Sequence, residues 1–280
     1  MIKEKAYAKV NLFLNVTGKR LDGYHDLEMV MASIDLFDVL TFELLKEKQI
    51  VIESNVKITQ VMEENLVYKI AKSIQEDFNI QFGVKIHIKK NIPIAAGLAG
   101  GSADGAATLR GLNKLWKLKL SLDELSKMGS KFGADIPFCI YNKLCIARGK
   151  GEELLFIKKS LKLPILLINP NIKISTKDVF SQFLEEDIQF RKISDMTAGI
   201  YNCNIELIER EMYNSLEKIA FKIEPKIETI KNKIIDLGIS GVLMSGSGAT
   251  VFAISKDKNK LKEIMDVFND YYFKKLTKIR

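Results

Sequence analysis

The chain has 280 residues, of which 47% are hydrophobic and 28% are charged, a balance typical of a soluble globular protein with room for two domains. Its formal net charge of +8 comes from lysines spread along the sequence, not from a compact basic cluster, which favours a small anionic ligand over nucleic acid. Three cysteines without a Cys-x-x-Cys pair, two histidines, a polar start and no apolar run of about 18 residues argue against disulfides, zinc, a signal peptide and a membrane span, and predict a cytoplasmic protein.

The first predicted element is a strand over residues 7–16. Its apolar residues alternate, so that Ala8 and Val10 point to one face while Lys9 and Asn11 project side by side from the other. A lysine on a strand is most often a solvated charge at a sheet edge. The pattern by itself therefore favours a solvated Lys9, with a polar site as the alternative.

A turn follows this strand at Asp22-Gly23 and leaves Tyr24 and His25 on a loop. Loops carry functional residues more often than core elements do. A lone histidine is most often packed or simply exposed, but this one has a tyrosine beside it and a turn to present it. Both interpretations of His25 stay open.

Two more strands are predicted over residues 37–45 and 49–56, on either side of a charged turn. Asn65 then caps an amphipathic helix, because an apolar residue recurs at helical spacing after it. A further strand is predicted over residues 84–90, where alternation places His87 toward solvent.

The most informative stretch is a segment rich in glycine and alanine from Pro93 to Asn113, between a predicted strand and a predicted helix. Glycine has no Cβ, so Gly97, Gly100 and Gly101 can adopt backbone angles closed to other residues and let a ligand approach peptide N–H groups. Ser102 is predicted to cap the helix. Free amides and the positive end of a helix would then meet at one point, which suits a phosphate group.

Two familiar phosphate-binding patterns do not fit this segment. The P-loop requires a lysine and a hydroxyl residue where Ser102 and Ala103 stand, and the glycine spacing differs from G-x-G-x-x-G. A tight structural turn therefore remains the alternative to a phosphate loop. Gly105 is predicted to loosen the helix entry, because an interior glycine costs about 1 kcal/mol relative to alanine.

A short helix over residues 121–132 is predicted from a capping box formed by Ser121 and Glu124, and Gly133 ends it. Asp135 follows in an apolar turn stiffened by proline, where a carboxylate is poorly solvated. A buried acid needs a partner or a chemical task. Asp135 is therefore either half of a structural ion pair or a reactive acid.

The second half of the sequence shows a change of character near residue 160, where we place a domain boundary. A helix opening at Ser175 carries Phe180, and residues 185–204 give no clear pattern. The other predicted elements are strands over 145–157 and 164–170, helices over 205–223 and 225–237, a strand, glycine turn and strand over 241–255, and a helix from 256 to about 272.

The run PIAAGLAGGSADGAAT from Pro93 to Thr108 resembles the phosphate loop of the GHMP kinases, which transfer the γ-phosphoryl group of ATP to a small-molecule alcohol. The residues around Asp135 resemble the family's G-A-D-x-P segment, and the turn SGSGAT resembles its third glycine-rich motif, which closes against the phosphate loop. The resemblance implies an α+β, two-domain GHMP kinase fold. Its N-terminal ATP-binding domain, similar to domain 2 of ribosomal protein S5, would span residues 1–160, and a ferredoxin-like domain on the substrate side would span residues 161–280.

The resemblance also implies roles for single residues. The aspartate of G-A-D-x-P faces the first-strand lysine in the family, which carries over to Asp135 and Lys9 as catalytic residues. ATP and Mg²⁺ are the implied cofactors, and the metal ligands are not identified. The implied nucleotide-binding residues are Pro93, Ile94, Ala95, Ala96, Gly97, Leu98, Ala99, Gly100, Gly101, Ser102 and Ala103, with Asn65 and Leu66 beside the adenosine.

The segment AKVNLFLNVTGKRLDGYHDLE from Ala8 to Glu28 is similar to the branch of the family that phosphorylates the 2-hydroxyl of a cytidine-diphosphate-linked methylerythritol in the non-mevalonate isoprenoid pathway. This similarity implies that Asn11, Tyr24 and His25 line the substrate pocket and that Phe180 stacks on the cytosine. The expected partner is thus a small molecule, with no nucleic acid or membrane, and the oligomeric state is open.

Two other functions stay open at this point. The chain could be another GHMP kinase that acts on homoserine or a mevalonate-like alcohol. It could also be a non-catalytic module that binds a nucleotide or RNA, although the presence of both Lys9 and Asp135 argues against that.

Overall fold

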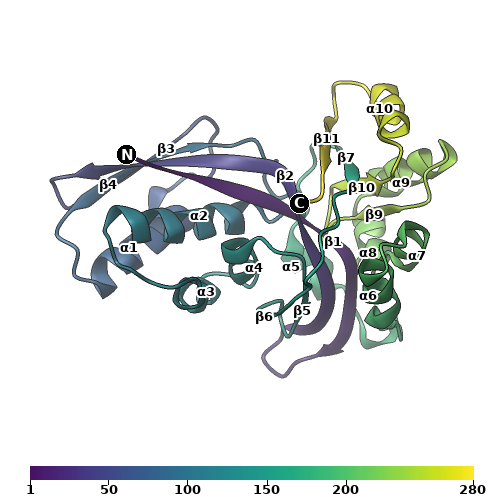
Figure 1. Ribbon diagram of the computed structural model, residues 1–280, viewed down its shortest axis with the longest axis horizontal. Helices are drawn as coiled ribbons and strands as arrows, with labels where there is room; N and C mark the ends of the chain where they lie inside the picture. The colour runs from purple at the N-terminus through teal and green to yellow at the C-terminus, as the bar shows by residue number, and fades with distance from the viewer. The chain divides into compact units, whose positions relative to one another are not determined.

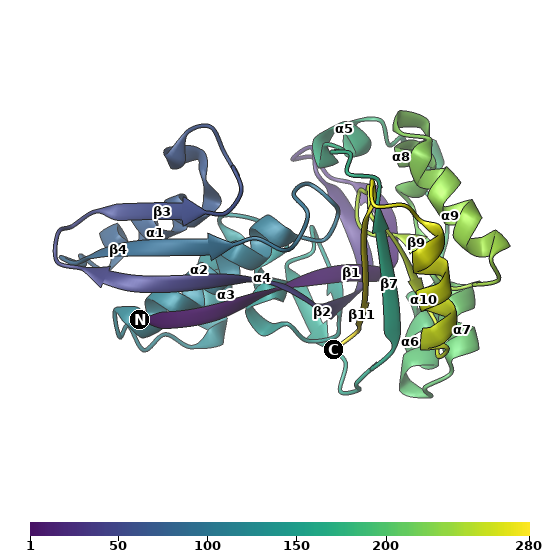
Figure 2. The ribbon, with the colours of Figure 1, turned by 90° about the horizontal axis from the view of Figure 1, so that it is seen from above.

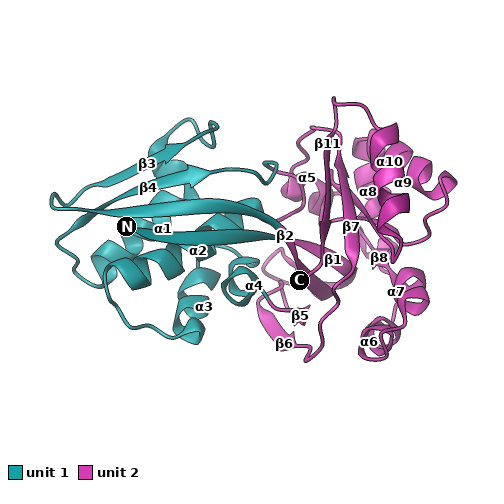
Figure 3. Cartoon of the chain, turned by 45° about the horizontal axis from the view of Figure 1, so that its top comes forward, with its two compact units in different colours: residues 1–8, 36–94, 99–142 teal, residues 9–35, 95–98, 143–280 magenta.

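The structure is a computed structural model that describes residues 1–280, and its chain divides into two compact units. Two long strands, β1 (Ile2–Lys19) and β2 (His25–Leu45), are labelled in Figure 1. Both strands supply residues to both units. Figure 3 colours unit 1, residues 1–8, 36–94 and 99–142, apart from unit 2, residues 9–35, 95–98 and 143–280. The predicted domain boundary near residue 160 falls inside unit 2 and stays a prediction.

Unit 1 consists of strands with helices packed on one of their faces (Figure 2). Strand β4 pairs in parallel with β3 and antiparallel with the second half of β2. Helix α2 packs against α1, α3 and α4. The further elements of unit 1 are β3 (Ile50–Ser54), η1 (Met62–Glu64), α1 (Leu66–Asp77), β4 (Gly83–Lys89), α2 (Gly100–Leu115), α3 (Leu122–Ser130) and α4 (Ile136–Tyr141).

The local patterns of unit 1 explain its elements. Asn65 accepts a hydrogen bond from the N–H of Val67 and begins α1, and Ser121 forms the predicted capping box with Glu124 at the start of α3. Along β4 the apolar side chains are buried, and His87 is exposed as predicted. These signals are confirmed.

Unit 2 contains an antiparallel sheet with the strand order β11-β7-β10-β9. Strand β7 is almost completely buried, as its apolar sequence predicts. In the same unit, β5 pairs with β2 and β6, and β8 pairs in parallel with β1. The strands that lie wholly within unit 2 are β5 (Cys145–Arg148), β6 (Glu153–Phe156), β7 (Pro164–Asn169), β8 (Tyr213–Asn214), β9 (Val242–Met244), β10 (Val251–Ile254) and β11 (Phe273–Lys278).

The helices of unit 2 are α5 (Thr176–Ser181), η2 (Glu185–Asp187), α6 (Ile193–Tyr201), α7 (Ile205–Glu211), α8 (Glu217–Ile223), α9 (Lys226–Asp236) and α10 (Lys258–Val267). None of the helices in the chain combines the length and the apolar character that crossing a lipid bilayer requires.

Two of the helices predicted for unit 2 were wrong. The helix expected over residues 205–223 is interrupted by β8, because Tyr213 and Asn214 pair with β1 and the side chain of Asn214 accepts the N–H of Leu216. The last helix ends at Val267 and not near residue 272, and the strand β11 follows it. Pairing with the apolar strand β7 stabilises β11. The sequence of β11 itself does not indicate this distant partner.

Candidate active site

The helix α2 begins inside the glycine-rich segment, but not at the predicted cap. Ala99 occupies the N-cap position with a φ of 54°, and its carbonyl accepts the first helical hydrogen bond from the N–H of Ala103 at 2.8 Å. Ser102 therefore lies within the first turn, and the prediction that it caps the helix was wrong. The N–H groups of Gly100, Gly101 and Ser102 have no partner within the helix. They are available to an anion.

Residues 95–98 lie in unit 2 and pack against the turn between β9 and β10, which is the SGSGAT motif. The carbonyl of Gly97 accepts a hydrogen bond from Ser245 Oγ at 2.9 Å, and the N–H of Thr250 donates to the carbonyl of Ala96 at 3.3 Å. The contact expected between this motif and the phosphate loop is thus present within unit 2. The sequence did not single out Ser245 for it.

Lys9 and Asn11 lie together on β1, as the strand period predicts. Lys9 Nζ donates to Asn11 Oδ1 at 2.7 Å and to the carbonyl of Gly97 at 3.2 Å. Lys9 is only 4% exposed, so the interpretation of a solvated edge lysine was wrong. Unit 2 provides no carboxylate partner for this ammonium group. Both acceptors are neutral oxygen atoms, so no anion within unit 2 balances the charge of this buried ammonium group.

Asp135 is the N-cap residue of α4, yet its side chain makes no capping hydrogen bond. The carboxylate is half-buried, and no ion pair within unit 1 involves it. The start of α2 lies near this turn, since a Cβ added to Gly133 would be 3.9 Å from Ser102 Oγ. Lys9 belongs to unit 2 and Asp135 to unit 1, so their pairing stays a prediction.

The aromatic rings of His25 and Phe180 lie together in unit 2, with centroids 5.3 Å apart and planes inclined by 31°. His25 is the first residue of β2 and is buried, so the loop predicted for it was wrong. Burial, together with the charge of Lys19, lowers the pKa of His25, and its Nε2 atom has no hydrogen-bond partner. The cluster therefore offers neutral rings and one free polar atom.

Phe183 and Tyr24 are two further aromatic residues of unit 2. Phe183, which the sequence did not single out, lies 5.7 Å from the His25 ring in an edge-on arrangement. Its spacing of three residues from Phe180 was the available signal. Tyr24 is exposed, and the ammonium group of Lys150 lies 4.0 Å above its ring.

On the nucleotide side of the predictions, Asn65 is buried and Leu66 is half-buried. Asn65 Oδ1 accepts the N–H of Val67 at 2.9 Å, so the cap uses its oxygen. The Nδ2 group of Asn65 is left for another acceptor, and its contact with adenosine stays a prediction.

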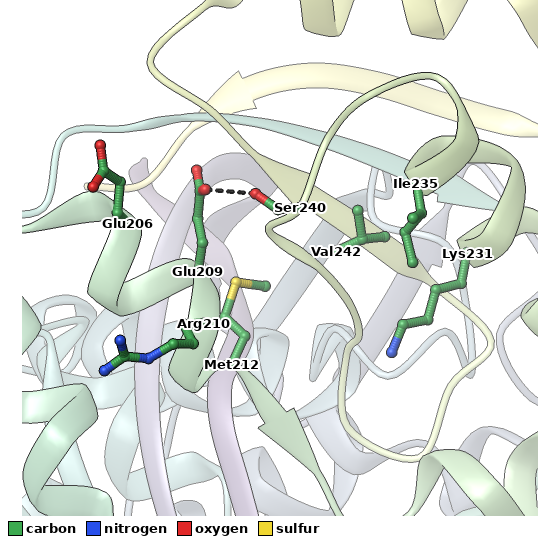
Figure 4. Close-up of a pocket in the computed structure, with 8 residues that line it drawn as sticks. All are labelled: Glu206, Glu209, Arg210, Met212, Lys231, Ile235, Ser240 and Val242. Carbon is green, nitrogen blue, oxygen red and sulfur yellow. Dashed lines mark hydrogen bonds between the residues drawn. The ribbon is translucent and has the colours of Figure 1, made fainter.

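A surface pocket of about 550 Å³ lies elsewhere in unit 2 (Figure 4). Ser240 donates to Glu209 at 2.7 Å in this pocket, and Lys231 is paired with Glu217 at 2.6 Å. None of the predicted site residues lines it. The pocket is lined by Glu206, Glu209, Arg210, Met212, Lys231, Ile235, Ser240 and Val242.

Comparison with known proteins is consistent with these features. The family described as GHMP kinases N terminal domain matches residues 65–143, and the family described as GHMP kinases C terminal matches residues 196–274. A protein of Staphylococcus aureus (strain bovine RF122 / ET3-1), named putative 4-diphosphocytidyl-2-C-methyl-D-erythritol kinase, is 41% identical over 96% of this chain and 95% of its own. A protein of the same name from Staphylococcus haemolyticus (strain JCSC1435) is 40% identical with the same coverage.

Solved structures agree with this. A crystal structure of 4-(cytidine 5'-diphospho)-2C-methyl-D-erythritol kinase has a TM-score of 0.85 and 28% identity and covers 99% of both chains. Homoserine kinase from Cytophaga hutchinsonii shares the fold, with a TM-score of 0.76 and 21% identity over 100% of this chain and 94% of that one. The chain belongs to the GHMP kinase family and is a kinase. The family and the α+β fold expected from the sequence are confirmed.

Proposed function

We propose that this kinase uses ATP to phosphorylate the 2-hydroxyl of 4-diphosphocytidyl-2-C-methyl-D-erythritol. The observation that carries the proposal is the match, at 41% identity over 96% of the chain, to a protein named for that substrate. The ring cluster of His25, Phe180 and Phe183 supports it, since stacked aromatic side chains bind a planar base such as cytosine.

Phosphoryl transfer depends on positioning and on charge stabilisation more than on covalent chemistry. In this proposal the free amides of Gly100, Gly101 and Ser102 bind the triphosphate. Asp135 accepts the proton of the substrate hydroxyl, and Lys9 stabilises the negative charge that develops on its oxygen. The proposal keeps an ATP-binding domain in residues 1–160 and a substrate-side domain in residues 161–280, with Asn11, Tyr24 and His25 of the first domain also lining the substrate pocket.

Magnesium is proposed as the companion of ATP. No group of three or more His, Cys, Asp or Glu side chains in the chain could hold a metal ion. Mg²⁺ usually keeps several waters and is held by substrate phosphates with one or two carboxylates, so it suits a chain without a metal cage. When bound, it would neutralise phosphate charge, and we assign no residue to it. A cytoplasmic location fits the use of ATP and the three free cysteines.

The direct test is to incubate the protein with ATP, Mg²⁺ and 4-diphosphocytidyl-2-C-methyl-D-erythritol and to measure ADP and the phosphorylated product. Homoserine and mevalonate serve as comparison alcohols. Faster turnover of either comparison alcohol would contradict the proposed substrate and leave the kinase assignment intact.

Replacing His25 or Phe180 by alanine is expected to raise KM for the cytidine substrate. Base stacking on an aromatic ring contributes about 1 to 3 kcal/mol, so each change corresponds to a KM increase of about 5- to 150-fold. KM for ATP should stay the same. Phe82→Ala, which removes a half-exposed ring in unit 1, is the control and should change neither constant. A rise in KM for ATP instead would mean that the rings serve the nucleotide.

A further inference from the structure

A buried cluster in unit 1 joins one lysine to two aspartates from different elements. Lys90 directly follows β4, Asp38 lies on β2 and Asp104 lies in α2. Lys90 Nζ lies 2.5 Å from Asp38 Oδ2 and 2.7 Å from Asp104 Oδ2. All three side chains are at most 5% exposed. The cluster is therefore isolated from bulk water, and ionic interactions are stronger in such an interior than they are in water.

The cluster holds the chain on both sides of the glycine-rich segment. Asp38 Oδ1 accepts hydrogen bonds from the N–H groups of Asn91 at 2.5 Å and Ile92 at 2.8 Å, just before the segment begins. At the other side, a Cβ added to Gly100 would lie 3.4 Å from Lys90 Nζ. The ammonium group thus lies beside the first residue of α2, where the free amides are.

The charges of the cluster do not balance when both aspartates are ionised. Burial raises the pKa of Asp104 to about 7, and Asp38 adds to the shift while Lys90 opposes it. The pKa of Lys90 is itself raised, because the two carboxylates outweigh the burial that lowers it. Asp104 Oδ1 has no hydrogen-bond partner. The charged groups that face Asp104 are Lys90 and Asp38, so the cluster carries no net charge with Asp104 protonated and one negative charge with it ionised.

We propose that Lys90 and Asp104 position the first turn of α2 for the phosphates of the nucleotide, and that the net charge of their cluster controls how tightly the nucleotide binds. This inference rests on the proposed role of the α2 amides in binding the triphosphate. A negative charge beneath those amides repels the polyphosphate. Binding of ATP therefore favours the protonated form of Asp104, and a rise in pH through neutrality weakens it.

The expected result is a KM for ATP that increases about three- to tenfold between about pH 6 and about pH 8, since one proton changes an affinity by at most about tenfold per pH unit. Asp104→Asn keeps the shape of the side chain and removes its titration. In this variant KM for ATP should lose that increase, while kcat is little changed. Steady-state kinetics of both proteins are measured in the same buffers. The titration of ATP itself then affects both KM values equally and drops out of the comparison.

Glu4→Gln is the matched control. Glu4 is also a buried carboxylate tied to α2, through Arg110 at 3.0 Å and Lys114 at 2.6 Å, but it lies away from the first turn of the helix. In the Glu4→Gln variant, KM for ATP should depend on pH as it does in the unaltered protein. The inference is overturned if KM for ATP is independent of pH in the unaltered protein, or if active Asp104→Asn keeps the same increase.

Thermal unfolding gives a second readout that does not need turnover. The pKa of Asp104 is raised from 3.8 to about 7 on folding, so the stability that this group contributes is complete below pH 3.8 and is lost as the pH rises to about 7. Asparagine imitates the protonated acid. At about pH 8 the Tm of Asp104→Asn should equal or exceed that of the unaltered protein, and a clearly lower Tm would contradict the proposed charge state. Absence of turnover by the unaltered protein would instead contradict the proposed function.

Discussion

Asp135→Asn is expected to lower kcat by about 10²- to 10⁴-fold, which is the usual loss when a general base is removed. The carboxylate is half-buried and has no ion-pair partner within unit 1, so its removal breaks no interaction that unit 1 needs for folding. The amide has nearly the same shape but cannot accept the proton of the substrate hydroxyl. KM for both substrates should therefore change little, as for a group that acts only in the transition state.

Asp123→Asn provides the control for this variant. Asp123 is an exposed carboxylate at the start of α3 that accepts a hydrogen bond from the Tyr141 hydroxyl. Its replacement should leave kcat within about twofold, as surface changes usually do. Unchanged kcat in Asp135→Asn would remove Asp135 from the mechanism, and a parallel rise in KM would indicate a binding role.

Gly97→Ala is expected to destabilise the protein by about 2 to 4 kcal/mol, because it combines backbone strain with a collision. Gly97 has a φ of 74°, and a Cβ there would lie 2.0 Å from the carbonyl oxygen of Ser245 and 2.9 Å from that of Gly248. Neither backbone oxygen can move without displacing the turn between β9 and β10. Chemical denaturation should show the loss of unfolding free energy, and the ability to bind ATP should fall with it.

Gly101→Ala is the matched control for the same segment. A Cβ on Gly101 would meet no atom within 4 Å, and the residue lies in a helix, where alanine is favoured over glycine by about 1 kcal/mol. Its unfolding free energy should stay the same or increase. Equal stability of Gly97→Ala and Gly101→Ala would show that Gly97 does not pack against the turn.

Local patterns in the sequence predicted local structure well. The caps at Asn65 and Ser121 depend on residues within one helical turn, and both are present. The alternation along β1 placed Lys9 and Asn11 side by side, which is the part of the candidate site that a strand period can reveal. Their burial was not predictable, because it depends on elements far along the chain.

The wrong predictions for Ser102 and Gly105 have a similar origin, because each depends on structure outside the pattern that was used. Ser102 has the side chain of a good cap, but the turn before it places Ala99 in the left-handed conformation and begins the helix earlier. Gly105 looked like a weak point of the helix by propensity. In the structure a Cβ there would lie 2.9 Å from Ile70 and 3.2 Å from Ile136, so the absent side chain allows close packing of α2 with its neighbours.

The cluster of Lys90, Asp38 and Asp104 shows most clearly what cannot be predicted from the sequence. Lys90 is separated from Asp38 by 52 positions and from Asp104 by 14, and none of the three stands in a pattern that distinguishes it from a surface charge. Only the pairing of β2 with β4 and the start of α2 bring them together. Charged residues that are brought together only by tertiary structure do not recur at a regular spacing in the sequence.

The course of β1 and β2 also limits how this protein can be divided. Each unit is assembled from three separate stretches of the chain, which alternate along the sequence. No single cut yields a fragment that holds one unit whole and nothing of the other. A chimera that exchanges one complete unit between two relatives must therefore exchange three stretches together. For the same reason, fusion or duplication of one continuous gene segment cannot transfer a single unit by itself.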